Sequence, residues 1–137
     1  MSAGAAVKAA LEAALRAEQG LAGVGLHDAL RQAQDRPDRG ELPRVELGEP
    51  GVADWGAKDW AGREVRTAAT VRVAAGQAGR LGALVGTVER AGAALAGTHG
   101  GWRVASVALV RTRVLGEGAK GTAVLVEHRV RVVEQPA

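Results

Sequence analysis

Two long stretches in the last third of the chain alternate valine with polar residues, and this alternation constrains the fold more than any other feature. They are residues 102–115 and 121–134, which are joined by the turn sequence GEGAKG. A period of two is typical of strands with one face in a core and the other exposed. Residues 63–74 alternate in the same way. We expect the following hairpin residues to share a buried face: Val104, Ala108, Val110, Val114, Val124, Val126, Val130 and Val132.

The remaining segments complete a pattern of helices and strands. Residues 3–19 and 77–95 place apolar side chains three or four positions apart, which predicts two amphipathic helices. Residues 43–48 are a short strand candidate. Residues 26–42 and 49–61 show no period, and we expect them to be loops.

The predicted order of elements is therefore helix, strand, strand, helix, strand, strand. Two helices packed on one face of an antiparallel, mostly four-stranded sheet make an α+β domain. We expect one such domain over residues 1–137, because this length suits a single domain.

The side chains available for a core are small. Hydrophobic residues are 47% of the sequence, but 29 of them are Ala, 18 are Val and 13 are Leu. Each buried position then contributes less than usual to stability, so we expect self-association to supply part of it.

Gly82, Gly86 and Gly92 lie inside the second predicted helix, where each lowers the stability of the helix by about 1 kcal/mol relative to Ala. Either close approach of a neighbouring backbone or a general compositional bias explains them, and we favour close approach.

The composition excludes several classes of function. The chain has no cysteine, which excludes disulfide frameworks, thiol nucleophiles and zinc–thiolate sites. It has no run of about 18 apolar residues, so we expect no membrane span and no membrane partner. His27, His99 and His128 are far apart and no phosphate-binding loop occurs. We therefore expect no enzyme, no catalytic or metal-ligating residues and no cofactor, and we interpret His128 as a satisfied histidine near the sheet edge.

The predicted loop at 49–61 holds candidate interaction residues. Trp55 and Trp60 are two of the three tryptophans, and the chain has no other aromatic residue apart from histidine. Tryptophan is enriched at protein interfaces, but the indoles could equally fold back to fill the small-residue core, and both interpretations stay open. Asp54 and Asp59 lie beside them. Paired carboxylates can perform acid–base chemistry or bind a hard cation, although a solvated acidic loop is the simpler interpretation.

The sheet face opposite the valines carries arginine. Arg111, Arg113, Arg129 and Arg131 are expected to crowd one patch of it. We favour a solvated face with Glu127 as a local ion partner, then a contact with another protein, then a contact with nucleic acid. A formal net charge of +3 is weak evidence for nucleic acid. The candidate partner interface comprises Asp54, Trp55, Asp59, Trp60, Arg111, Arg113, Arg129 and Arg131.

The order of these motifs resembles a known family. An amphipathic N-terminal helix leads through LHDAL to PRVELGEP, then to DWGAKDWAGREVRTAATVRV, a second helix and a closing hairpin. These strings resemble the small tail-completion proteins of long-tailed phages and gene transfer agents, which are similar in fold to the tail terminator of phage lambda. The resemblance runs from about residue 5 to residue 134. It is sharpest at PRVELG, at DWGAKD and at the strand opening Gly62–Glu64.

The resemblance implies a structural role. Proteins of this family form a ring, typically a hexamer, that caps the tail tube, ends its polymerisation and joins it to the head–tail connector. The implied partners are other copies of the chain, the major tail tube protein, the connector, and DNA that passes through the lumen without sequence-specific binding. The implied location is the bacterial cytoplasm during assembly and then a phage or phage-like particle. The alternative is a small nucleic-acid-binding module that uses the arginine-rich face.

Overall fold

A long antiparallel pair of strands, β4 (Gly62–Val73) and β7 (Gly121–Glu134), forms the centre of the sheet. The structure is a computed structural model and describes residues 1–29 and 42–135. The β4–β7 register runs from Gly62 opposite Val133 to Val73 opposite Thr122. Alternate residues of both strands are buried, as the sequence pattern predicts. The buried residues on the face toward the helices are Val65, Thr67, Ala69, Val71 and Val73 of β4, and Val124, Val126, His128, Val130 and Val132 of β7.

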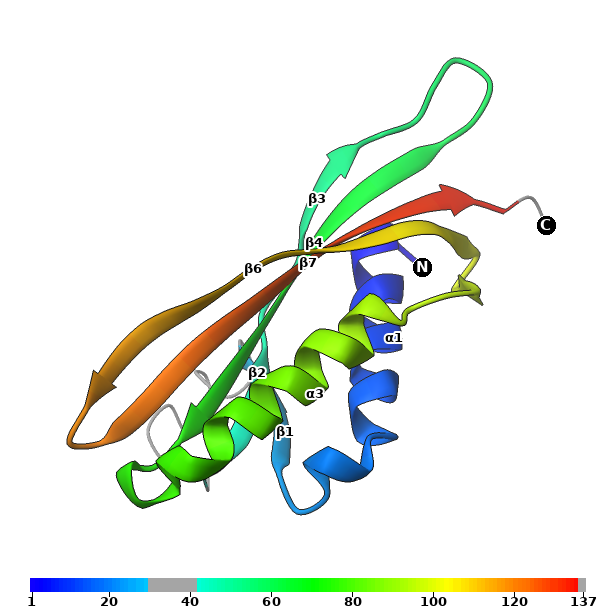
Figure 1. Cartoon of the computed structure of the whole chain (residues 1–137). Helices are drawn as coiled ribbons and strands as arrows, with labels where there is room; N and C mark the ends of the chain where they lie inside the picture. The colour runs from blue at the N-terminus through cyan, green and yellow to red at the C-terminus, as the bar shows by residue number, and fades with distance from the viewer. Residues whose placement is uncertain (30–41, 136–137) are drawn as a thin grey trace.

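Five further strands flank this pair. β6 (Trp102–Gly118) pairs with β7 and is followed at that edge by β5 (Thr98–His99). On the other side of β4 lie β2 (Arg44–Leu47) and then β1 (Gly25–Asp28), which runs parallel to β2. β3 (Gly51–Asp54) also pairs with β4. The order is β1-β2-β4-β7-β6-β5, with β3 off this path, and the sheet is strongly curled (Figure 1).

The predicted sheet is wrong in strand number, in direction and in element order. The described residues form a seven-stranded mixed sheet, not a four-stranded antiparallel one. β3 and all of β1 except Gly25 lie in the segments expected to be loops, 49–61 and 26–42, and β5 lies between the second predicted helix and the closing hairpin. These strands have two to four residues each, so they are too short to show a period of two. Backbone pairing with longer neighbours fixes them instead. The part of 26–42 from residue 30 to residue 41 is outside the described residues.

Two helices, α1 (Ala3–Arg16) and α3 (Leu81–Ala93), pack against one face of the sheet (Figure 1). Both are shorter than predicted. The chain after α1 forms a 3-10 turn at Gln19–Leu21, and a second 3-10 segment, Ala75–Arg80, precedes α3. The α+β class and the placement of both helices on one face are confirmed for the described residues.

The hydrophobic core lies between these helices and the valine face. Leu11 and Leu15 of α1 and Val88 of α3 are almost completely buried against it. Leucine and valine fill the layer, and Trp102 is the one tryptophan packed against its border. The core is therefore built from the small aliphatic side chains that the composition predicts.

The face predicted for β6 is partly wrong, because bulges change its alternation. Register shifts occur between Val104 and Ser106, between Leu109 and Arg111, and between Val114 and Gly116. An extra residue in one strand turns the following side chains to the other face. Ala108 consequently pairs with Arg129 on the polar face, and Val107 takes the place opposite Val130 on the valine face.

The far end of the β6–β7 hairpin extends past the helices. Every residue of the chain from Leu109 to Lys120 is exposed. They include four large apolar side chains, namely Leu109, Val110, Val114 and Leu115. We call this end, residues 109–123, the distal hairpin.

The glycines of α3 differ in their surroundings. A Cβ added to Gly92 would lie 2.2 Å from His128 Cε1, whereas one added to Gly82 would meet nothing within 4 Å. At Gly86 an added Cβ would meet only the flexible end of Arg90, at 3.1 Å. Close approach therefore explains Gly92, although the neighbour is a side chain and not a backbone. It does not explain Gly82.

We predict opposite effects for alanine at two positions of α3. Gly92→Ala should lower the free energy of unfolding by about 1–3 kcal/mol, because the new methyl group overlaps the buried His128 ring. Gly82→Ala should raise it by about 0.5–1 kcal/mol, because alanine favours the helix and space is free. Urea unfolding followed by circular dichroism measures both. Equal stability of the two variants would contradict the packing of α3 on His128.

Candidate interaction surface

The sheet face turned away from the helices carries the predicted arginines. We call it the outer face. Arg129 and Arg131 point to it from β7, and the β6–β7 register places Arg111 opposite Glu127 and Arg113 opposite Leu125 on the same face. Along β7, positions 127 and 131 are about 13 Å apart at the usual rise of a strand. The four arginines therefore form a row along the outer face and do not crowd one patch.

Carboxylates pair with three of these arginines. Arg131 Nε lies 3.2 Å from Glu64 Oε1 on β4, and Arg129 Nε lies 3.8 Å from the same oxygen. Arg111 forms an ion pair with Glu127, as expected. The outer face is thus a surface of mixed charge, on which carboxylates compete with any incoming phosphate for these three arginines.

The two predicted tryptophans contact each other in the connection between β3 and β4. Their ring centroids are 5.1 Å apart and the ring planes meet at 69°, an edge-to-face pair. Trp55 is half-buried and the guanidinium of Arg131 lies 5.3 Å from its ring centroid. Trp60 is 40% exposed. Neither indole belongs to the hydrophobic core, so the core-filling interpretation is wrong.

Two local features hold this connection in shape. A Cβ on Gly62 would lie 2.6 Å from Trp60 Cζ3, so only glycine allows the indole to rest on the start of β4. The Asp54 carboxylate accepts a hydrogen bond from the backbone N–H of Gly56 at 3.1 Å and lies 3.3 Å from Arg63 Nη1. Asp54 therefore has a local structural partner, while Asp59 is exposed in the turn.

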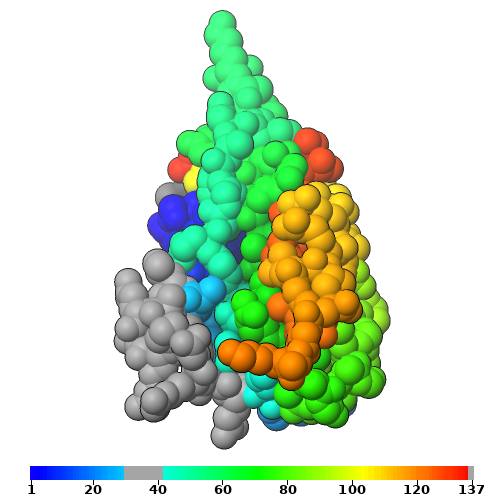
Figure 2. Space-filling model, turned by 90° about the vertical axis from the view of Figure 1, so that its left-hand side faces the viewer, coloured from blue at the N-terminus to red at the C-terminus, as the bar shows by residue number. Residues whose placement is uncertain are grey.

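We call β3, residues 55–61 and the first residues of β4 the Trp hairpin. It projects from the body of the molecule as a narrow arm (Figures 1 and 2). All four residues of β3 are exposed, including Val52, which is 50% exposed. The predicted interface residues Trp55 and Trp60 thus lie on this arm, away from the distal hairpin that carries Arg111 and Arg113.

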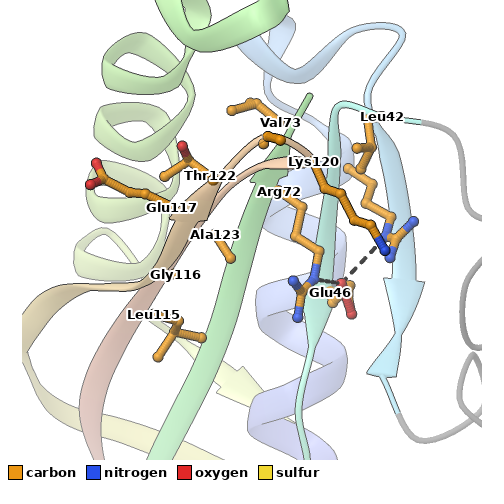
Figure 3. A pocket seen from close by; sticks show the side chains of 14 residues that line it. Leu42, Glu46, Arg72, Val73, Leu115, Gly116, Glu117, Lys120, Thr122 and Ala123 are labelled. Atoms are coloured by element: carbon orange, nitrogen blue, oxygen red, sulfur yellow. Dashed lines mark hydrogen bonds and ion pairs between the residues drawn. The ribbon is translucent and has the colours of Figure 1, made fainter. Parts of the chain in front are cut away.

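A groove that the sequence did not predict lies between β2 and the distal hairpin (Figure 3). Its volume is about 830 Å³. Glu46 on its wall forms ion pairs with Arg72 and, at 3.3 Å, with Arg44. Leu115 and Lys120 line it from the hairpin side. Strand pairing brings these segments together, because Arg44 lies opposite Arg72 and Arg72 lies opposite Ala123, so no local sequence signal identifies them.

The histidines are not brought together. His128 is 1% exposed beneath α3, and its Nε2 lies 3.0 Å from the backbone oxygen of Glu89. Burial disfavours the charged imidazolium and lowers the pKa of His128, although the contact with Glu89 acts in the opposite direction. The satisfied state of this histidine is confirmed, but its strand is in the middle of the sheet and not near an edge.

The described residues include no group of three or more His, Cys, Asp or Glu side chains that could hold a metal ion. None of the helices within residues 1–29 and 42–135 is long and apolar enough to cross a membrane.

Comparison with known proteins gives a likeness to a solved structure. No protein-family model and no curated protein sequence matches this chain. Among solved structures, the chain is similar to a chain of the virion of a native gene transfer agent particle, with a TM-score of 0.75 and 26% sequence identity. The likeness covers 97% of this chain and 99% of that one. The two chains therefore share a fold over nearly their whole lengths.

We predict that arginines of the outer face contribute little to folding. Arg131→Ser and Arg111→Ser should each lower the free energy of unfolding by less than about 1 kcal/mol, because their ion pairs are partly exposed. Val130→Ala is the matched control on the opposite face of β7 and should cost about 2 kcal/mol, because Val130 is fully buried. Denaturant titration measures all three. A larger loss for Arg131→Ser than for Val130→Ala would reverse the assignment of the two faces.

Proposed function

We propose that this chain is a structural component of a virion-type particle, in which copies of it form a ring that caps the tail tube. The observation that carries the proposal is the likeness to a gene transfer agent virion chain, because it extends over nearly all of both chains at 26% identity. The motifs PRVELG and DWGAKD, which resemble those of tail-completion proteins, lie on β2 and on the Trp hairpin. We take residues 1–137 as one tail-terminator-like domain.

The surfaces of the molecule support an assembly role. The Trp hairpin and the distal hairpin both project beyond the helices and expose apolar side chains. Within the described residues, β6 has no strand partner on the side away from β7 beyond its short contact with β5. An exposed strand edge with apolar side chains invites association with another chain. Contacts between subunits of a ring would cover these surfaces.

The proposed role requires no chemical reaction. The ring would end polymerisation of the major tail tube protein, present a surface to the head–tail connector, and let DNA pass through its lumen. Assembly would take place in the bacterial cytoplasm, and the protein would remain in the finished particle. The proposal covers a phage, a prophage remnant and a gene transfer agent alike.

Deletion of the gene in a particle-producing bacterium tests this role. We expect tails of uncontrolled length, or tails without heads, in negative-stain electron micrographs, because nothing would end the tube or join it to the connector. A plasmid copy of the wild-type gene should restore normal particles. Tails of normal length that are joined normally to heads in the deletion strain would eliminate the capping role.

A further inference from the structure

We propose that the tip of the Trp hairpin of one copy docks in the groove beside the distal hairpin of a second copy. This inference rests on the proposed function in that it names the contact that builds the ring. It concerns two surfaces of the same chain, at opposite ends of the molecule, which both expose apolar side chains and carry charges of both signs that can pair.

The tip of the Trp hairpin is an ordered apolar surface. Trp60 is 40% exposed although Trp55 packs against its ring and Gly62 lies directly beneath it. Large aromatic side chains held in one position contribute strongly to protein association, because little conformational freedom is lost on binding. Lys58 and Asp59 stand beside Trp60 and both are exposed. The tip therefore offers an indole flanked by an ammonium group and a carboxylate.

The groove offers the complementary groups. Its charged lining consists of three cations and two carboxylates: Arg44, Arg72, Lys120, Glu46 and Glu117. Glu46 already pairs with two of the cations, whereas Lys120 forms no ion pair with any residue in the described part of the chain. Leu115 on the same rim is 46% exposed. Leu115 can cover an incoming indole, and Lys120 can pair with an incoming carboxylate (Figure 3).

The geometry requires the contact to join two copies. β4 leads from the Trp hairpin at Gly62 to the groove at Val73. At the usual rise of a strand these ends lie about 35 Å apart, so a chain cannot reach its own groove (Figure 1). A contact between two different surfaces is head-to-tail, and its repetition generates a closed ring when the rotation closes.

Cysteine cross-linking tests this contact, because the wild-type chain has no cysteine. In the first sample, one protein carries Asp59→Cys and another carries Lys120→Cys, and the two proteins are mixed at high concentration and oxidised. In the second sample, a single chain carries both substitutions and is expressed in a particle-producing deletion strain. The control replaces Lys120→Cys by Arg16→Cys, which is exposed on α1. We expect at least about tenfold more cross-linked dimer than in the control, because docking raises the local concentration of the two thiols. In particles, the double variant should give a ladder of multimers.

The results of the cross-linking experiment test the proposed contact separately from the proposed capping role. A cross-link between positions 59 and 120 in either sample supports the contact. Yields no higher than the control in both samples, or a predominance of dimers joined through two copies of position 59, would overturn it. The deletion phenotype reports on capping independently, so a ring without this cross-link would disprove the contact and leave the proposed function standing.

Discussion

The structure depends on the pairing of β4 with β7, because this pair supplies the valine layer on which both helices pack. The helices cover only part of it. α3 has 13 residues and is about 20 Å long, whereas β6 has 17 residues and extends about 55 Å. Strands of that length cannot be covered by helices of this size. The ends that remain uncovered are the Trp hairpin and the distal hairpin.

This mismatch in length connects the fold to the proposed role. A chain with few large side chains gains limited stability from its own core, and its two projecting hairpins expose apolar groups that water solvates poorly. Contacts with further copies would bury these groups. The outer face differs from the hairpins, because Glu64 and Glu127 offset its arginines within the subunit.

The regular parts of the fold could be predicted from the sequence, because their signals are local and repeated. The alternation in β4 and β7 identifies the buried residues of both strands, and helical spacing identifies α1 and α3 within a few residues. The bulges of β6 leave no such signal, since one additional residue changes the face without changing the composition. Ala108 was assigned to the wrong face for that reason. Val110 and Val114 were wrongly expected to be buried, because they lie in the distal hairpin and are exposed.

The candidate site could be predicted only in part. The tryptophans and arginines stand out by type, but their partners are remote in the chain: Arg131 pairs with Glu64, which is 67 positions away. The groove joins β2, the end of β4 and the distal hairpin, and it follows from the pairing of strands that are remote in the sequence. Contacts between residues so far apart in the chain are decided by the assembled sheet and not by any single segment.

A cryo-electron microscopy reconstruction of particles purified from the producing bacterium tests the central claim most directly. The account predicts a ring of this fold, expected to be sixfold, at the head-proximal end of the tail tube, with β4 and β7 recognisable in each subunit and the projecting hairpins at subunit boundaries. Particles whose head–tail junction is built entirely from other chains, with this fold absent from the virion, would contradict it.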